Sequence, residues 1–234
     1  MSTFSWGAVI VAAGRGTRFG RPKQLVEIAG APMLAWSIRT FAAMPEVQAI
    51  VVVTESEWLR EVSEIALHAG GAKCAATVPG GATRQVSTFN GLRTMPESCD
   101  AVFVHDGARP LVREDDVRSA MAVVRAGHGS LLAAPVVDTI KIVGTETNVV
   151  ERTLERSLLW AAQTPQFATR GDMLRAHEAG ASDAVDATDD AMLLERIGVA
   201  MHVVQASPEN FKVTLPHDRD RAEHALLARM TEPR

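Results

Sequence analysis

The sequence predicts an α/β fold in which a mostly parallel sheet is covered by helices on both faces. Apolar runs rich in Val, Ile and Ala alternate with segments of helical periodicity through the first half of the chain. The runs are nearly uninterrupted, which is typical of parallel strands buried on both faces. The helical segments between them are long enough for right-handed crossovers. These observations favour a Rossmann-like twisted sheet in a single domain that spans residues 1–234.

Each expected element has its own signal. The run AVIVAA at 8–13 indicates a buried strand, and APMLAWSIRTFA at 31–42 has helical spacing with Pro32 near its first turn. The segment 114–126 has helical spacing and ends at Gly127. Further strands are expected at 49–54, 72–78, 101–105, 130–137, 199–205 and 211–214, and further helices at 56–68, at 83–92 and from Pro216 onward.

The segment 138–156 departs from this rhythm. It alternates apolar and polar residues around a Gly-Thr-Glu-Thr-Asn turn, which indicates a β-hairpin. Its strands carry too many charges for a central position in the sheet. We therefore expect a protruding dimerisation arm that pairs with a second subunit.

Composition excludes several classes of protein. The 234 residues include 24 basic and 28 acidic side chains, and this balance argues against general nucleic-acid binding. No apolar run approaches the ~20 residues that span a bilayer, and the N-terminus lacks the basic region of a signal peptide. Cys74 and Cys99 form neither a disulfide framework nor a metal-binding pair. We expect a soluble, cytoplasmic protein without a nucleic-acid or membrane partner.

The first strand opens into a loop that combines glycines with cations, and no carboxylate occurs before Glu27. Glycines let backbone amides approach phosphate oxygens, and the cations neutralise their charge. A surface turn with solvated arginines is the alternative, but four cations without a carboxylate repel one another. The glycines are Gly14, Gly16 and Gly20, and the cations are Arg15, Arg18, Arg21 and Lys23.

Two known phosphate motifs do not match this loop. In a dinucleotide fingerprint the third glycine comes three positions after the second, whereas Gly20 comes four positions after Gly16. No Gly-Lys-Ser or Gly-Lys-Thr follows, so the P-loop pattern fails as well. The loop is expected to bind a polyphosphate by another arrangement.

Three expected strands end in polar or glycine-rich segments. Strand 8–13 leads into the cationic loop, strand 72–78 into Gly80 and Gly81, and strand 101–105 into Asp106. Ligands of open parallel sheets gather at the carboxyl ends of the strands. The convergence therefore predicts a binding site at this edge.

Asp106 and Arg109 are candidate ligand contacts in the segment VFVHDGARP. A lone aspartate that faces a polyphosphate suits a magnesium anchor, since this ion prefers one or two carboxylates together with phosphates. A turn-capping aspartate and a surface arginine are the alternatives, and a phosphate gripped by two nitrogens is the functional interpretation of Arg109. His105 is interpreted as structural, because it lies on the other face of its strand.

The segment GGATRQVS offers Gly80 and Gly81 as a surface for a flat base and Ser87 as a hydroxyl donor. A helix start capped by Thr83 explains the same residues almost as well.

Two lysines suit the stabilisation of a transition state. Lys23 follows the stiff Pro22, and a preorganised cation is what such a role requires. Lys212 lies in an otherwise apolar segment, where a lysine is costly without an anion unless it occupies the solvent side of an edge strand. No nucleophilic triad or zinc motif is present in the sequence.

The segments AAGRGTRFGRPKQ, GGATRQVS, HDGARP, PVVDTIK, TPQF, TDDA and FKVT, in this order, resemble the 2-C-methyl-D-erythritol 4-phosphate cytidylyltransferase family of isoprenoid biosynthesis. The resemblance covers residues from about 8 to 230. It implies that the phosphate of methylerythritol attacks the α-phosphate of CTP, releasing pyrophosphate and forming 4-diphosphocytidyl-2-C-methyl-D-erythritol, with magnesium as cofactor.

The resemblance also implies roles for individual residues. The loop from Ala12 to Arg18 would wrap the triphosphate. The catalytic cations would be Arg18, Lys23 and Lys212. The nucleotide would be bound by Ala12, Ala13, Gly14, Gly16, Gly80, Gly81, Ser87 and Gly107. The polyol phosphate would be bound by Asp106, Arg109, Thr139, Arg156, Thr164 and Thr188, and Asp106 would also hold the metal. Thr139 and Arg156 would reach the active site of the partner, which makes the enzyme a homodimer.

Three alternatives stay open at this point. A ribitol 5-phosphate cytidylyltransferase would share the fold, the arm and the loop, although Thr139, Arg156 and the TPQ segment favour methylerythritol. A non-catalytic nucleotide-binding regulatory module is disfavoured because the cations and Asp106 are all retained. A nicotinamide-dependent oxidoreductase is disfavoured by the displaced glycine of the loop.

Overall fold

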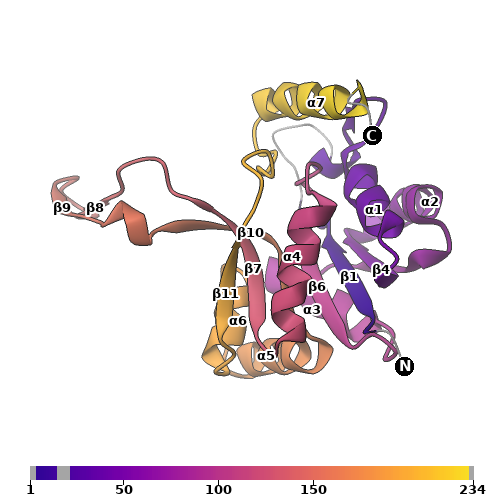
Figure 1. Cartoon of the computed structure of the whole chain (residues 1–234), viewed down its shortest axis with the longest axis horizontal. Helices are drawn as coiled ribbons and strands as arrows, with labels where there is room; N and C mark the ends of the chain where they lie inside the picture. Colours follow the sequence, from indigo (N-terminus) through magenta and orange to yellow (C-terminus); the bar gives the residue numbers. More distant parts are fainter. Residues whose placement is uncertain (1–3, 15–21, 232–234) are drawn as a thin grey trace.

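The computed structural model describes residues 4–14 and 22–231. Within these residues, seven strands form one twisted sheet in the order β11-β7-β10-β6-β1-β4-β5 (Figure 1). The strands are β1 (Trp6–Val11), β4 (Val47–Thr54), β5 (Cys74–Pro79), β6 (Ala101–Asp106), β7 (Gly129–Pro135), β10 (Trp160–Thr169) and β11 (Met201–Gln205). The helices are α1 (Met33–Ala43), α2 (Leu59–Gly70), α3 (Arg84–Thr94), α4 (Glu114–Arg125), α5 (Arg170–Ser182), α6 (Asp190–Arg196) and α7 (Pro216–Thr231).

The sheet is mostly parallel, as predicted. β1 lies between β4 and β6 and pairs in parallel with both, and β5 and β11 also pair in parallel with their neighbours. β10 runs antiparallel to β6 and β7. The α/β fold class expected from the sequence is therefore confirmed.

β10, α5 and α6 lie in a region, 157–198, to which the sequence pattern assigned no element. Proline inside a strand pattern argues against a central strand, because it cannot donate to the ladder. Here the pairing of β10 with β7 is interrupted between Ala162 and Gln166, and Pro165 lies in that interruption. The structure thus tolerates a proline where the sequence rule would reject it.

The strand expected at 211–214 is absent from the described part of the chain, and this prediction was wrong. The amide of Val213 donates to the carbonyl of Ala108 (2.9 Å), and its own carbonyl accepts from Nζ of Lys23 (2.9 Å). The backbone is thus satisfied by a loop and a side chain instead of a sheet edge.

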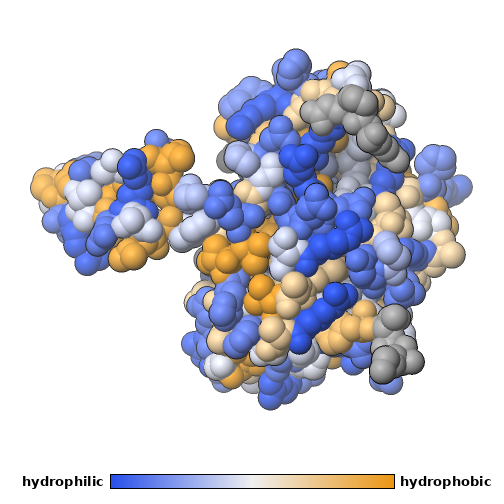
Figure 2. Space-filling model, in the orientation of Figure 1, coloured by the Kyte–Doolittle hydropathy of each residue, from blue (hydrophilic) through white to orange (hydrophobic). Residues whose placement is uncertain are grey.

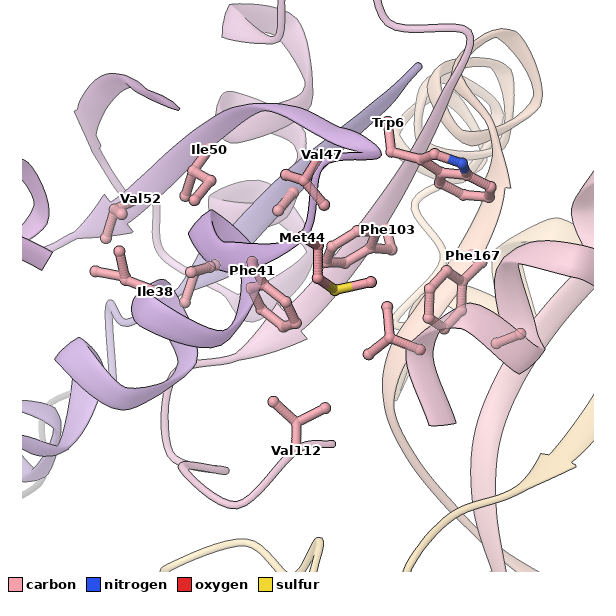
Figure 3. Packing of buried hydrophobic residues seen from close by; sticks show 14 of the residues in the cluster. Trp6, Ile38, Phe41, Met44, Val47, Ile50, Val52, Phe103, Val112 and Phe167 are labelled. Carbon is pink, nitrogen blue, oxygen red and sulfur yellow. The ribbon is translucent and has the colours of Figure 1, made fainter. Parts of the chain in front are cut away.

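Alternating side chains of the strands supply two hydrophobic layers. On one face, Trp6, Ile10 and Phe103 pack with residues of α1, α2 and α4. Figure 3 shows Trp6 and Phe103 of this layer beside Phe41 of α1. The ring centroid of Phe103 lies 4.8 Å from that of Phe41 and 5.2 Å from that of Phe167. On the other face, residues of the same strands pack against α3, α5 and α6. Helices therefore cover both faces of the sheet.

α7 packs over the small sheet formed by β2 (Glu27–Ile28) and β3 (Ala31–Pro32). Ala222 and Leu226 of α7 join a third apolar cluster with Val213 and Ala108. Through this cluster, the segment that carries Lys212 packs against the loop after β6. Four 3₁₀ turns complete the described elements: Lys23–Leu25, Ser56–Trp58, Gly71–Lys73 and Arg156–Leu158.

The predicted hairpin is present as β8 (Lys141–Val143) and β9 (Val150–Thr153), which pair antiparallel in a sheet of their own. Figure 1 shows it projecting away from the main sheet. Figure 2 shows the hairpin as a lobe on a narrow neck, with apolar side chains on its surface. Among the described residues, no helix combines the length and apolarity needed to cross a bilayer.

Candidate active site

Two adjoining cavities lie at the carboxyl ends of the strands. The larger, of about 480 Å³, is lined by residues that follow or end β1, β4, β5 and β6, among them Gly14, Glu55, Gly80 and Asp106. The smaller, of about 160 Å³, is lined by residues of β10 and the segment before α6. Both cavities are lined by Arg84, Asp106 and Lys212. The convergence predicted for this edge of the sheet is confirmed.

The Gly80-Gly81 turn requires glycine for close packing. A Cβ on Gly80 would lie 2.5 Å from Cβ of Ala13 and 2.8 Å from Oγ of Ser87. The amide of Gly81 donates to Oγ of Ser87 (3.0 Å), and that hydroxyl donates to the carbonyl of Thr83 (2.8 Å). Thr83 also caps α3 by accepting from the amide of Val86 (3.1 Å). The helix capped by Thr83 is therefore present, and the glycines that it supports line the larger cavity, whereas a base lying against them stays a prediction.

Asp106 ends β6 within a cluster of cations. Its Oδ1 accepts from Nε of Arg84 (3.2 Å) and its Oδ2 from Nζ of Lys212 (2.7 Å), while Nε of Arg109 lies 3.9 Å away. Burial raises the pKa of this carboxyl, but the three cations lower it by more than burial raises it. The pKa of Asp106 therefore lies well below its usual range. The carboxylate is thus ionised, and the three cations leave an excess of positive charge between the cavities.

Lys212, for which the sequence predicted an anionic partner, forms an ion pair with Asp106. The contact with Asp106 joins two residues 106 positions apart. Thr164 of β10 supports the backbone of Asp106, because its Oγ1 accepts from the amide of that residue (2.9 Å). Arg109 is buried and donates to the carbonyl of Asn210 (2.9 Å). It lines the smaller cavity with Thr164 and Thr188.

His105 is fully buried, in line with its structural interpretation. Its Nε2 lies 3.1 Å from the carbonyl of Arg109 and its Nδ1 lies 3.2 Å from Oγ1 of Thr164. Burial lowers the pKa of His105 from 6.5 to about 4. Between these values the unfolded chain binds a proton that the folded chain rejects, so the folded state loses stability as the pH falls from about 6.5 to about 4.

Between pH 7 and pH 4, the wild type should lose roughly 3 kcal/mol more of its free energy of unfolding than His105→Gln does, because glutamine does not titrate. Urea denaturation of both chains across this range measures the difference. His68→Gln, at an exposed histidine, serves as the control for the substitution itself. Identical pH slopes for the wild type and His105→Gln would contradict the prediction.

Arg84 is a site residue to which the sequence assigned no role. It is the first residue of α3, and it donates from Nε to Asp106 and from Nη2 to Asp190 (2.9 Å). A cation at a helix N-terminus opposes the helix dipole and therefore needs an anionic partner. That mismatch is the signal in the sequence that points to Arg84. Gln24 and Glu55 also line the larger cavity without having been predicted.

Several predicted site residues do not line these cavities. Ala12 and Gly107 are buried behind the larger one, where their amides donate to the carbonyls of Val53 (2.7 Å) and Val11 (2.9 Å). Gly16 and Arg18 lie outside the described residues. Thr139 and Arg156 lie on the arm and its base, and Nη1 of Arg156 donates to the carbonyl of Val137 (2.9 Å). Lys23, Ala13 and Gly14 do line the larger cavity.

The fold and site define an α/β enzyme of the nucleotidyltransferase class, with a glycine-lined cavity and a cationic wall that it shares with a second cavity. The family model for 2-C-methyl-D-erythritol 4-phosphate cytidylyltransferase matches residues 7–228. The chain belongs to this family.

Relatives in sequence and in structure carry the name of the same enzyme. The chain is 38% identical over 227 residues to the 2-C-methyl-D-erythritol 4-phosphate cytidylyltransferase of Pelotomaculum thermopropionicum, covering 95% of this chain and 94% of that one. It is 39% identical over 222 residues to that of Geobacter metallireducens, covering 92% and 95%. The structure of 4-diphosphocytidyl-2C-methyl-D-erythritol synthase from Anaerococcus prevotii superimposes with a TM-score of 0.84 at 26% identity, covering 95% and 96%. The Francisella tularensis cytidylyltransferase gives 0.79 at 30% identity, covering 94% and 99%.

Proposed function

We infer that this chain transfers CMP from CTP to 2-C-methyl-D-erythritol 4-phosphate, with release of pyrophosphate, as a step of isoprenoid biosynthesis. Membership of the family supports the reaction, and the observation that carries it is the shared wall of the two cavities. Arg84, Asp106 and Lys212 line both, so a nucleotide in one and a phosphate in the other would meet at these residues.

The larger cavity suits CTP. Gly80 and Gly81 present backbone to a flat base, and Ser87 holds that backbone in place. At the other side of the cavity Gly14 and Lys23 are placed for the triphosphate. The loop predicted to wrap the phosphates, with Arg18, continues from Gly14.

The smaller cavity suits a short polyol phosphate. Its volume of about 160 Å³ leaves no room for a second nucleotide. Arg109 and Lys212 supply positive charge, and Thr164 and Thr188 supply hydroxyl groups at its wall. These residues are the predicted acceptor contacts that lie within one chain.

The reaction requires positioning and charge stabilisation more than covalent catalysis. A phosphate oxygen of the acceptor forms a bond to the α-phosphorus of CTP, the bond between the α-phosphorus and the bridging oxygen breaks, and its electron pair leaves with pyrophosphate. The attacking phosphate is already anionic, so no general base is needed. Lys23 and Lys212, with Arg18, would stabilise the charge that develops on the α-phosphate.

Magnesium is the proposed cofactor, and Asp106 is the residue that would hold it. Each oxygen of Asp106 accepts from one cation, Arg84 or Lys212, and keeps a further lone pair that a metal could use. The nucleotide would supply the remaining ligands, because magnesium takes one or two carboxylates together with phosphates. The described residues contain no cluster of three His, Cys, Asp or Glu that could hold a metal without such help. When bound, the ion would neutralise phosphate charge alongside the cations of the wall.

We also propose a homodimer in which each arm completes the site of the other chain. Val137 (80% exposed), Val149 (62%) and Leu158 (73%) are apolar residues of the arm and its base that face solvent. Thr139 and Arg156 line neither of the two cavities that share Arg84, Asp106 and Lys212, as expected if they serve the partner's acceptor, and Arg156 lines a separate cavity at the base of the arm. The proposed compartment is the cytoplasm, in keeping with the free thiols Cys74 and Cys99.

An assay of pyrophosphate release tests the function. Each of the four nucleoside triphosphates is supplied with magnesium and with either methylerythritol 4-phosphate or ribitol 5-phosphate. We expect rapid release only from CTP with methylerythritol 4-phosphate. Faster release with ribitol 5-phosphate would establish the ribitol alternative, and CTP binding without release would establish a regulatory module.

A further inference from the structure

A buried carboxylate, Asp190, lies beneath the shared wall but outside both cavities. Its side chain is 1% exposed, and both oxygens have partners: Oδ2 accepts from Nη2 of Arg84 (2.9 Å), and Oδ1 lies 3.1 Å from Nε2 of His177. Burial raises the pKa of Asp190, but Arg84 and His177 lower it by more than burial raises it, so the net shift of this pKa is downward. An ionised aspartate is thus built into the core directly behind a cavity residue.

His177 holds this carboxylate from α5. The ring is fully buried and stacks on Phe89, with centroids 6.1 Å apart and planes 11° apart. Its Nδ1 is buried without a hydrogen-bond partner among the described residues. Because an ionised carboxylate can only accept, Nε2 carries the proton and donates it to Asp190. The imidazole is therefore oriented by a single polar contact and by packing.

Arg84 is held along one edge by two carboxylates. Nε contacts Asp106 at the end of β6, and Nη2 contacts Asp190 at the start of α6. Nη1 makes no hydrogen bond within the part of the chain that the structure describes, and the side chain is 27% exposed at the wall of both cavities. A planar guanidinium anchored at two points has little freedom to rotate, so the direction of its remaining donors is set.

We propose that Asp190 and His177 are positioning residues for Arg84, whose guanidinium contacts phosphate groups between the two cavities. Without Asp190, the guanidinium would be held by Asp106 alone and would compete with Lys212 for that carboxylate. His177 acts one step further back, by fixing the orientation of Asp190. The nature of the phosphates rests on the proposed function, whereas the arrangement of the four side chains does not.

A double-mutant cycle tests the proposal, with kcat and both KM values measured for D190N, R84K and R84K/D190N. Lysine keeps the charge of Arg84 but cannot bridge two carboxylates. We expect D190N to lower kcat by about tenfold or more, since a misplacement of about 1 Å can cost ~100-fold. In the R84K background the same change should cost less than about twofold, because Asp190 acts through Arg84. If D190N lowers kcat by the same factor in the wild type and in R84K, the two residues act independently and the proposal is overturned.

A second pair of variants stands on its own if D190N fails to fold. H177Q places an amide nitrogen near the position of Nε2 and can still donate to Asp190, whereas H177F fills similar space without a donor. We expect H177Q to retain at least about half of the wild-type kcat and H177F to lose about fivefold or more. Equal activities of the two would overturn the role of His177. E195Q, which removes an exposed carboxylate from α6, is the matched control and should leave kcat unchanged.

The proposed function and this inference fail in distinguishable ways. If the wild-type chain releases no pyrophosphate with any substrate pair, the proposed function is wrong, and the same cycle is measured as affinity for pyrophosphate by calorimetry. A wild-type chain that does not bind pyrophosphate would overturn the proposed phosphate contact of Arg84. Coupling between Arg84 and Asp190 in that affinity would still support positioning, and independent effects would refute it. Thermal unfolding of every variant shows that the differences arise in folded chains.

Discussion

Lys23→Ala should lower kcat by at least ~100-fold, the scale for removing one preorganised stabiliser of a transition state. Lys23 begins a 3₁₀ turn after Pro22 and lines the larger cavity. Its Nζ donates to the carbonyl of Val213 (2.9 Å), next to Lys212. The cation is therefore held in place before substrate arrives, so its loss removes stabilisation that solvent cannot replace. Steady-state assays with CTP and methylerythritol 4-phosphate measure the effect.

A matched lysine serves as the control. Nζ of Lys73 donates to the carbonyl of Met44 (2.7 Å), so it makes the same kind of contact, but it lines neither cavity. Lys73→Ala should leave kcat within about twofold of the wild type. If Lys23→Ala also stays within about threefold, Lys23 is a structural residue of the loop and not a catalytic one.

Mixing two inactive variants should restore activity if the arms exchange. Lys23→Ala removes a residue of a chain's own cavity, and Arg156→Ala removes a residue that would serve the partner's site. A heterodimer of the two chains has one intact site and one that lacks both residues. After random exchange of subunits we expect about a quarter of the wild-type activity, because half of the dimers are mixed and each has one good site.

The mixing experiment needs each variant measured alone at the same total concentration, where we expect at most a few per cent of wild-type activity. Mixing Lys23→Ala with Lys212→Ala is the control. Lys23 and Lys212 line the same cavity, but each intact residue would remain in a site that lacks the other, so no recovery is expected. Equal recovery in both mixtures, or in neither, would argue against an arm that completes the partner's site.

Local patterns were enough to predict most of the sheet. Strands β1, β4 and β6 are apolar over nearly their whole length, because parallel strands covered on both faces bury nearly all of their side chains. The glycine turn after β5 and the aspartate that ends β6 were predicted at the same edge for the same topological reason. β10 was missed because its proline contradicts the strand pattern, and the interruption that accommodates it is visible only when both neighbouring strands are in place.

Lys212 shows where sequence reasoning reached its limit. The cost of burying a lysine correctly indicated an anionic partner, but the predicted strand around it was wrong. The backbone of the next residue, Val213, is satisfied by Lys23 and Ala108, two residues that no local pattern connects with it. The apolar cluster that α7 shares with Ala108 then places the segment beside the loop after β6.

By itself the sequence determined the fold class, the edge of the sheet at which the two cavities lie, and the family. Periodicity and glycine spacing express these features over stretches of about ten residues, which is the range over which a chain's neighbours set its conformation. Only the tertiary structure decided which charges meet. Arg84 pairs with Asp190, and Lys212 with Asp106, across 106 positions each. Such pairs follow from the order of strands in the sheet, because that order brings together side chains that are far apart in the sequence. The residues next to each of them in the sequence do not indicate the contact.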